Sequence, residues 1–292
     1  MIDLHLHSSR SDGTLSPAGL VERGRQMQLT ALALTDHDTT AGLDEFLAAA
    51  NGTGPLALPG VEISAEWHPG TMHVLGYLVD HHSDALERTL VWIRQGRSAR
   101  NRQICRRLNQ LGYDIRWEDV AELAGGDVVG RPHIAEALVR RGYVATVREA
   151  FDNLLAEGRP AYVGRRRLPP EKCIDVIRAS GGLAVLAHPL TLDLEESALI
   201  KLVGELAARG LDGIECYYPE HPQEYVAWLL RICERFDLIP TGGTDFHGDN
   251  SSGIEMGIGA GDLAIPDNLV DRLFSRWQRG NAGDNRLMAE TS

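Results

Sequence analysis

The sequence predicts an α/β fold in which a mainly parallel sheet, open or closed into a barrel, carries a small helical insertion. Short apolar runs typical of strands recur along the chain, and amphipathic helical stretches separate several of them. The region from about residue 99 to residue 165 contains several helix-like stretches and almost no strand pattern. We therefore expect an α/β body made of residues 1–98 and 166–292, and an insertion made of residues 99–165.

Seven segments are expected to form the strands of the body. They are residues 1–7, 31–35, 56–63, 73–79, 183–187, 213–217 and 238–241. Ser16 is a favoured N-cap residue and Pro17 suits the first helical position, so a helix is expected between the first two strands, ending near Gln28. A proline pair that ends at Pro170 starts another helix, which ends at Gly181. Further helices are expected at residues 83–111, 195–209, 223–236 and 266–279.

Composition excludes several classes of protein. With 43% hydrophobic and 24% charged residues, the 292-residue chain can bury a large core and is neither disordered nor fibrous. Its net charge of −12 argues against a protein that coats nucleic acid or membranes through general positive charge. No segment resembles a signal peptide or approaches the roughly 18 apolar residues of a membrane span, so a cytoplasmic protein is expected. The four cysteines form no CxxC pair, which indicates buried, reduced thiols.

Histidines and carboxylates gather at the ends of the expected strands. His5 and His7 are two residues apart in the first strand, so both imidazoles lie on one face. This pair alone would be equally consistent with two ordinary polar strand residues. The other strand edges are similar, however, and carry Asp12, Asp36, His37, Asp38, Glu62, His73, His188, Asp245 and His247. Because α/β folds assemble their active sites at strand ends, this pattern predicts a metal site.

The donor types limit which metals the site would hold. Mixed imidazole and carboxylate ligation without thiolates suits Mn, with Fe or Zn as alternatives, and nine such ligands would need two or three ions. Four further histidines lie in expected loops or at helix starts, where solvated surface positions are expected: His68, His81, His82 and His221.

The motifs occur in a characteristic order along the chain. They are the HxH pair followed by Asp12, Thr35-Asp36-His37-Asp38, Gly60-Val61-Glu62, Ala187-His188-Pro189 and Thr244-Asp245-Phe246-His247. This set resembles the polymerase-and-histidinol-phosphatase (PHP) family of metallophosphoesterases over about residues 1–80 and 170–250. The resemblance implies a distorted (β/α)7 barrel of the PHP type with a trinuclear metal site.

The resemblance also implies a division of the ligands among three metals. One metal would be held by His5, His7, Glu62 and Asp245; Glu62 would bridge to a second, completed by His73 and His188; the third would be held by Asp12, His37 and His247. Asp36 and Asp38 remain outside this set. At least one of them is expected to orient a ligand histidine, although a helix-capping role is an equal alternative for each.

Such a centre needs no serine or cysteine nucleophile. Clustered divalent ions lower the pKa of a bridging water and neutralise phosphoryl oxygens, so the expected nucleophile is a metal-bound hydroxide. The leaving-group acid is not identified by the sequence, with Asp12 or a site histidine as candidates. The competing interpretation is an amidohydrolase-type barrel, which often bridges its metals with a carboxylated lysine. Lys172 and Lys201 are the only lysines, and both fall in expected helices.

The insertion has the opposite charge to the body. Residues 94–167 contain 15 Arg, no Lys and 9 acidic residues, a charge of +6, whereas the rest of the chain carries −18. Arg97 and Asn101 fall within an otherwise apolar stripe of an expected helix, where polar groups need partners. A phosphate would supply them, and the expected substrate-binding residues are Arg97, Arg100, Asn101, Arg102, Arg131 and His133. Residues 165–167 add three more arginines, whereas Arg106, Arg107, Arg140 and Arg141 are expected on solvated helix faces.

An arginine-rich lid above a metal cluster suggests a small substrate with two anionic ends. Within the PHP family the arrangement resembles the 3′,5′-nucleoside bisphosphate phosphatases and the related 5′–3′ RNA-trimming enzymes. This resemblance implies removal of the 3′-phosphate from a molecule such as adenosine 3′,5′-bisphosphate. The alternatives are an exonuclease on short oligonucleotides, a histidinol-phosphate phosphatase and a polymerase-type accessory domain. The expected partner is a small phosphorylated nucleotide, without duplex nucleic acid, membrane or obligate protein partner.

Overall fold

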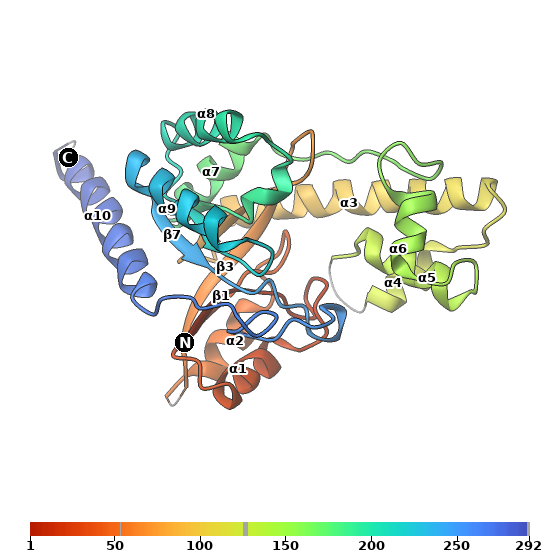
Figure 1. Cartoon of the computed structure of the whole chain (residues 1–292), viewed down its shortest axis with the longest axis horizontal. Coiled ribbons are helices and arrows are strands. Elements are labelled where there is room, and N and C mark those ends of the chain that lie inside the picture. Colours follow the sequence, from red (N-terminus) through yellow and green to blue (C-terminus); the bar gives the residue numbers. More distant parts are fainter. Residues whose placement is uncertain (53, 125–127, 291–292) are drawn as a thin grey trace.

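The computed structural model describes residues 1–52, 54–124 and 128–290, with side chains up to residue 280 (Figure 1). Its body contains one seven-stranded sheet, in which the strands follow each other in sequence order. The strands are β1 (Ile2–Leu6), β2 (Ala31–Leu34), β3 (Leu56–Ala65), β4 (Met72–Tyr77), β5 (Leu183–Leu186), β6 (Gly213–Tyr217) and β7 (Ile239–Gly242). The predicted α/β class and the seven predicted strands are thereby confirmed.

Strand β4 runs against both of its neighbours, whereas the other four neighbouring pairs are parallel. The short connection between β3 and β4 explains this, because a parallel pair needs a crossover of a dozen or more residues. Ser64 faces His73 in this hairpin. Strand β3 continues to Ala65, beyond the predicted end at residue 63, so Glu62 lies inside the strand rather than at its end. Glu62 forms an isolated parallel β-bridge with His37, which lies just after β2.

The sheet curls toward a barrel, and its two edge strands approach each other. The His7 backbone N–H donates to the carbonyl of Phe246, which follows β7, at 3.0 Å. The approach is close enough to require glycine at position 243, because a Cβ there would lie 2.2 Å from the Cβ of His5. The curl therefore brings the end of the chain's first strand to the segment that follows its last.

Helices cover the outer face of the sheet. They are α1 (Pro17–Gln26), α2 (Leu43–Ala50), α7 (Pro170–Ala179), α8 (Glu196–Ala207) and α9 (Gln223–Phe236). Helix α10 (Leu269–Glu290) packs against strand residues of the opposite face, and 3₁₀ turns lie at Pro189–Leu192 and Gly248–Asn250. Ser16 caps α1 as predicted, since its hydroxyl accepts from the Gly19 backbone at 3.0 Å. Alternate strand residues serve two buried clusters: Leu32 and Leu34 belong to the helix-covered one, and Ala33 to the one that α10 joins.

The insertion is built on α3 (Asp84–Gln110), a helix that starts on the body and extends away from it (Figure 1). It also contains α4 (Trp117–Ala124), α5 (Arg131–Arg140), α6 (Val147–Ala150) and a π-helical turn at Phe151–Leu155. These elements share a separate buried cluster that includes Ile104, Ile134 and Leu138. Helix α3 crosses the expected boundary between residues 98 and 99 without interruption, so the two parts are linked by a continuous helix.

The four cysteines are buried and form no disulfide, as expected. Within the described ranges, no helix is both long enough and apolar enough to cross a lipid bilayer.

Candidate metal centre

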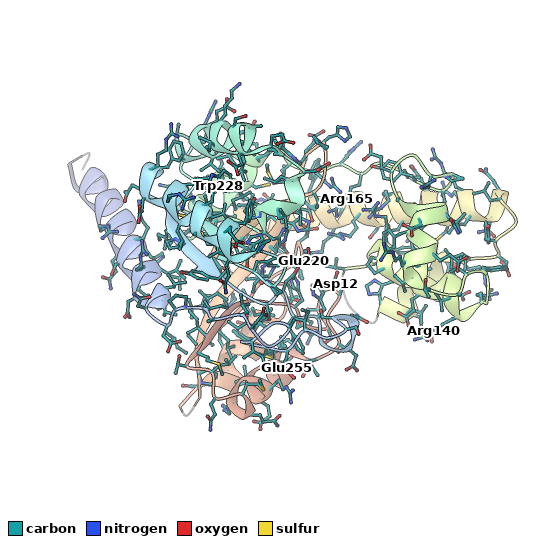
Figure 2. All side chains as sticks on the ribbon, viewed as in Figure 1. Asp12, Arg140, Arg165, Glu220, Trp228 and Glu255 are labelled. Atoms are coloured by element: carbon teal, nitrogen blue, oxygen red, sulfur yellow. The ribbon has the colours of Figure 1, made fainter. Side chains whose placement is uncertain are left out.

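The nine side chains predicted as metal ligands converge on one region of the barrel. They come from β1, β3 and β4 and from the segments that follow β1, β2, β5 and β7. Asp12 lies on the side of the body that faces the insertion, where Arg165 also lies, whereas Arg140 lies on the insertion itself (Figure 2). The curl of the sheet thus collects residues that are up to 242 positions apart in the chain.

Glu62 occupies the middle of this cluster, and one of its oxygens faces three imidazoles. Glu62 Oε2 lies 3.3 Å from His5 Nε2, 3.2 Å from His7 Nε2 and 2.8 Å from His37 Nδ1. The carboxylate is fully buried on β3, so its position is set by the strand. One oxygen of this carboxylate therefore lies close to ring nitrogens of three histidines.

The other oxygen of Glu62 faces a second pair of histidines. Glu62 Oε1 lies 2.7 Å from His73 Nδ1 on β4 and 3.0 Å from His188 Nε2 after β5. The two oxygens thus point to two different sets of imidazoles. This is the arrangement expected of a carboxylate that bridges two metal ions.

Asp245 and Asp12 complete the cluster on its other sides. Asp245 Oδ1 lies 3.0 Å from His7 Nε2 and 3.4 Å from His5 Nε2. Asp12 Oδ1 lies 3.2 Å from His247 Nε2, and Asp12 Oδ2 lies 3.7 Å from His37 Nε2. Each carboxylate therefore has at least one oxygen directed at ring nitrogens.

Three overlapping groups have ligand atoms close enough to hold an ion. They are His5, His7, Glu62 and Asp245; His7, Asp12, His37 and His247; and His37, Glu62 and His73. The first group matches the set implied by the family resemblance, and the second matches the third set with His7 added. In the remaining group His37 takes the place expected for His188, although His188 also contacts Glu62.

Several buried atoms of these residues have no hydrogen-bond partner, which is the property expected of metal donors. They are His5 Nε2, His7 Nδ1 and Nε2, His37 Nδ1, His73 Nδ1, Glu62 Oε2, Asp12 Oδ1 and Asp245 Oδ1. Buried polar atoms are nearly always hydrogen-bonded. This many nitrogen and oxygen atoms without a hydrogen bond in one place therefore need another partner. Imidazole and carboxylate donors without thiolates fit divalent Mn, Fe or Zn.

The electrostatics of the cluster also favour cations. Burial disfavours the charged form of His7, but Asp245 and Glu62 raise its pKa to about 10. Burial lowers the pKa of His73 to about 4, with His37 and His188 adding to the effect and Glu62 opposing it. Burial opposes the ionisation of Asp12, yet His37 and His247 hold its pKa well below the ordinary range. An ionised Asp12 is suited to metal ligation.

Two carboxylates that sequence reasoning missed support the cluster from behind. Glu215 on β6 is fully buried, accepts from His5 Nδ1 at 2.9 Å and accepts from the His188 backbone at 2.8 Å. Asp3 on β1 accepts from the backbone and hydroxyl of Thr244, at 3.0 and 2.6 Å. Acids inside otherwise apolar strands were the available signal, since a buried carboxylate needs partners.

The predicted role of Asp36 and Asp38 is wrong. Asp36 accepts from the Ser8 backbone at 2.7 Å and from two serine hydroxyls, of Ser8 and Ser11, at 2.6 Å each. It therefore orders the segment after β1 rather than a ligand histidine. Asp38 accepts from the Ser64 backbone at 2.9 Å and is paired with Arg97. Neither carboxylate accepts from a ligand imidazole or caps a helix in these contacts.

Of the four histidines expected at the surface, His221 contradicts the prediction. It is only 8% exposed, and its Nδ1 donates to the Cys216 carbonyl at 2.9 Å. His68 and His82 are exposed as expected. His81 is half-buried and lies 2.9 Å from Asp44, and together with His82 these atoms form a fourth, solvent-facing group away from the centre.

Five arginines form a mostly buried cluster beside the centre, at Arg97, Arg100, Arg131, Arg165 and Arg167. Arg97 contacts Asp38 and the Ser64 hydroxyl, and Arg165 lies 3.5 Å from the same Asp38 carboxylate. Burial and the neighbouring guanidiniums hold the pKa of Arg100 well below its ordinary value. Asp38 is the only carboxylate among the described residues that is paired with any of the five.

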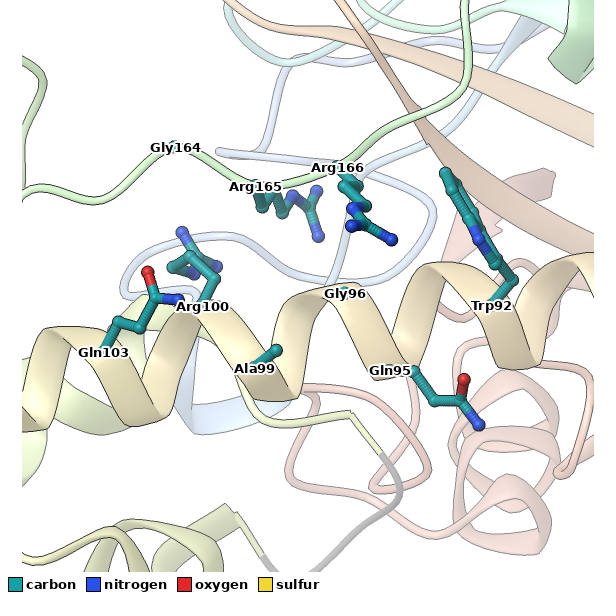
Figure 3. A pocket seen from close by; sticks show the side chains of 9 residues that line it. All are labelled: Trp92, Gln95, Gly96, Ala99, Arg100, Gln103, Gly164, Arg165 and Arg166. Atoms are coloured by element: carbon teal, nitrogen blue, oxygen red, sulfur yellow. The ribbon is translucent and has the colours of Figure 1, made fainter.

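Two pockets open onto this cluster. One, of about 430 Å³, lies between α3 and the segment before α7, with Arg100 facing Arg165 and Arg166 across it (Figure 3). The other, of about 610 Å³, is lined by Arg131, Arg165 and Arg167 together with the β3–β4 connection. Arg131 is held over the rings of Phe151 and Tyr162.

Besides Arg97, which is paired with Asp38, two of the six predicted substrate-binding residues have structural partners. The side-chain amide of Asn101 donates to the Val129 carbonyl at 2.5 Å, which ties α3 to the start of α5. Arg102 is exposed and stacks over Trp117, so it points away from the cluster. The position of Asn101 in an apolar stripe correctly indicated that its side chain needs a partner, and a backbone carbonyl is that partner. The four arginines expected on solvated faces, Arg106, Arg107, Arg140 and Arg141, are exposed.

His133 lies at the base of the insertion, in the first turn of α5. It is 6% exposed, and its Nδ1 accepts from the Gly130 backbone at 3.0 Å. The neutral ring therefore carries its proton on Nε2, which makes Nε2 a donor. Burial lowers the pKa of His133, and the charge of Asp12 opposes this effect. His133 therefore lies near enough to the candidate metal centre to feel the charge of one of its carboxylates.

Comparison with known proteins identifies relatives along most of the chain. The PHP domain family model matches residues 3–156. A 3′,5′-nucleoside bisphosphate phosphatase of Chromobacterium violaceum is 36% identical over 262 residues, covering 88% of this chain and 90% of that protein. The 5′–3′ exoribonuclease Rnm of Salmonella typhimurium is 38% identical over 248 residues, covering 84% of each chain. A structure from Bifidobacterium adolescentis, described as a metal-dependent phosphoesterase, has a TM-score of 0.82 at 32% identity and covers 94% of this chain and 96% of that one.

Proposed function

The chain belongs to the PHP domain family of metal-dependent phosphoesterases, and on this premise we propose that it removes the 3′-phosphate from nucleoside 3′,5′-bisphosphates. The product would be the nucleoside 5′-monophosphate, and adenosine 3′,5′-bisphosphate is the substrate we name first. The activity of the Chromobacterium relative supports this choice.

The observation that carries the proposal is a deficit of negative charge next to the candidate metal centre. Arg100, Arg131 and Arg167 have no carboxylate partner in the described part of the chain, and Asp38 serves both Arg97 and Arg165. Burying guanidiniums without counter-charges is costly, and a phosphate monoester brings about −1.5 to −2 charges at neutral pH. A terminal phosphate of the substrate would supply the missing partner.

Arg97 connects this cluster to the centre. It contacts Asp38, the residue after His37, and Ser64, which faces His73 across the hairpin. A molecule with one phosphate on the arginines and a second among the histidines would therefore be small. The two ends of a nucleoside bisphosphate meet this requirement, whereas a substrate with a single phosphate meets only half of it.

The candidate metal centre and the arginine cluster would have different roles in the reaction. Divalent ions in the His and carboxylate cluster, two or three per chain and Mn first by donor type, would activate a water and neutralise phosphoryl oxygens. Arg100, Arg131 and Arg167 would bind the 5′-phosphate through charge-assisted hydrogen bonds. The Nε2–H of His133 would donate to the same substrate from the base of the insertion.

Release of inorganic phosphate tests the proposal. We expect Mn-loaded protein to release phosphate from adenosine 3′,5′-bisphosphate and to leave adenosine 5′-monophosphate, identified by chromatography. Its kcat/KM should exceed that for adenosine 3′-monophosphate about tenfold or more, because charge-assisted contacts to the 5′-phosphate contribute roughly 1.5–3 kcal/mol. Failure to release phosphate from the bisphosphate would refute the proposed reaction.

Variants of the arginine cluster test the second phosphate site. Arg100→Gln and Arg131→Gln should each reduce the preference for the doubly phosphorylated substrate, while activity on the 3′-monophosphate changes less. Arg106→Gln is the matched control, since Arg106 is exposed on the same helix as Arg100. If both cluster variants keep the parental preference, the arginine cluster does not bind the 5′-phosphate.

A second candidate is 5′–3′ exonucleolytic cleavage of short oligonucleotides. It is supported by the Salmonella exoribonuclease, whose sequence is as similar to this chain as that of the phosphatase. A 5′-phosphorylated dinucleotide in the same assay separates the two activities. Release of a nucleoside 5′-monophosphate from it, at a kcat/KM above that for the bisphosphate, would favour the exonuclease.

A further inference from the structure

Strand β6 supplies none of the nine candidate ligands, yet the residues on and just after it contact three of them. Glu215 on the strand contacts His5 and His188, and Tyr218, directly after it, contacts Asp245. We propose that Tyr218 is a positioning residue that fixes Asp245 for the ion held with His5, His7 and Glu62. The inference rests on the metal-dependent function proposed above.

The contact divides the two oxygens of Asp245 between two roles. The Tyr218 hydroxyl donates to Asp245 Oδ2 at 3.2 Å. The other oxygen, Oδ1, is buried, has no hydrogen-bond partner and lies 3.0 Å from His7 Nε2. A carboxylate with one oxygen engaged by a phenol presents the other as a single ligand atom, and its rotation about χ2 is restricted.

Asp245 also has an uncommon backbone conformation. Its φ is +53°, in the left-handed region that few residues other than glycine adopt. Its Oδ1 lies near the imidazoles of His5 and His7, and its Oδ2 is contacted from the end of β6 by Tyr218.

Two histidine rings lie close to the ring of Tyr218. Its ring centroid lies 5.4 Å from that of His188 and 5.2 Å from that of His221. His221 is fixed by the hydrogen bond from its Nδ1 to the Cys216 carbonyl on β6. The buried His221, which the sequence placed at the surface, thus has a role as the back support of Tyr218. The hydroxyl therefore reaches Asp245 from a constrained ring.

Direct metal binding tests the proposal. Tyr218→Phe keeps the ring that contacts the two histidines and removes only the hydroxyl. We expect it to weaken binding of Mn²⁺ to metal-free protein about 10- to 100-fold at one of the sites, the range typical of outer hydrogen-bond partners of metal ligands. Competition with a chromophoric chelator measures this affinity without substrate. Tyr217→Phe, in the neighbouring half-buried tyrosine, is the control and should bind as the parent protein does.

A double-mutant cycle shows whether Tyr218 acts through Asp245. In an Asp245→Asn background, the additional Tyr218→Phe change should alter Mn²⁺ affinity by less than about twofold, because the two groups form one unit. Additive effects, or a Tyr218→Phe protein with parental affinity, would overturn the proposal. A protein that binds Mn²⁺ as expected but releases no 3′-phosphate would refute the proposed reaction and leave this inference standing.

Discussion

Asp38 and Arg97 form a buried ion pair at the junction of the barrel and the insertion. Asp38 is fully buried and Arg97 is 8% exposed, so neither charge is compensated by water. Burial disfavours ionised Asp38, but Arg97 and Arg165 hold its pKa far below the ordinary range. Asp38 also accepts from the Ser64 backbone, which ties the pair to the end of β3.

Removing one member of this pair should destabilise the protein. Arg97→Ala leaves Asp38 buried with Arg165 alone, at 3.5 Å, and we expect the free energy of unfolding to fall by about 3 kcal/mol. Urea denaturation followed by circular dichroism measures the loss.

The matched comparison is Arg94→Ala, one turn earlier in α3, where the guanidinium contacts the Asp38 carbonyl and the exposed Glu87. That variant should lose no more than about 1 kcal/mol. An Arg97→Ala protein of parental stability that loses its preference for the bisphosphate would assign Arg97 to the substrate rather than to the fold.

At the residue scale, the sequence could predict the candidate ligands because their pattern is local. A histidine pair with spacing two, or an acid directly after an apolar run, is visible in a few residues. Glu215 and Tyr218 have roles that depend on β6 lying between β5 and β7, which no local pattern states. Asn101 was recognised as needing a partner, but whether a ligand or the Val129 carbonyl supplies it depends on the packing of α5.

At the element scale, α3 is the structural link between the two parts of the molecule. It has 27 residues, includes Gly96 in its interior and ends just before Gly112. A Cβ at position 96 would lie 3.5 Å from the Cβ of Arg166, an ordinary contact. Gly112 has φ of +91°, a conformation that other residues adopt only with strain.

These two glycines should respond in opposite ways to alanine. Gly96→Ala should raise the free energy of unfolding by about 0.5–1 kcal/mol, because glycine in a helix interior costs conformational entropy. Gly112→Ala should lower it by about 1 kcal/mol, because a Cβ disfavours positive φ although the space around it is open. Chemical denaturation of both variants measures the difference, and a destabilised Gly96→Ala protein would show that Arg166 cannot accommodate the added methyl group.

Periodicity located the elements well but not their ends or directions. The predicted helix at residues 83–111 corresponds to α3, and the seven predicted strands are all present. The reversal of β4 follows from the length of its connection, and the extension of β3 to Ala65 follows from pairing with β4. Both depend on which strands pair, and a hydrophobic pattern along one segment does not contain that information.

At the scale of the whole molecule, charge and packing both divide the chain. The body carries the acidic residues that surround the candidate metal centre, whereas residues 94–167, the insertion with its two flanks, carry a charge of +6. The net charge of −12 therefore conceals two parts of opposite sign. The insertion also has its own buried cluster, which is separate from the two clusters of the barrel. We therefore expect the two parts to contribute separately to function.

A cavity in each core tests this division. Leu138 is fully buried in the insertion cluster and Leu32 is fully buried under the sheet, so Leu138→Ala and Leu32→Ala should each cost about 2–5 kcal/mol. Leu138→Ala should loosen the insertion, weaken discrimination between nucleoside bisphosphate and 3′-monophosphate, and leave Mn²⁺ affinity near the parental value. Leu32→Ala should impair metal binding and activity together. Hydrogen exchange would locate the loosened region in each variant, and loss of Mn²⁺ binding in Leu138→Ala would mean that α3 transmits the damage and that barrel and insertion fold as one unit.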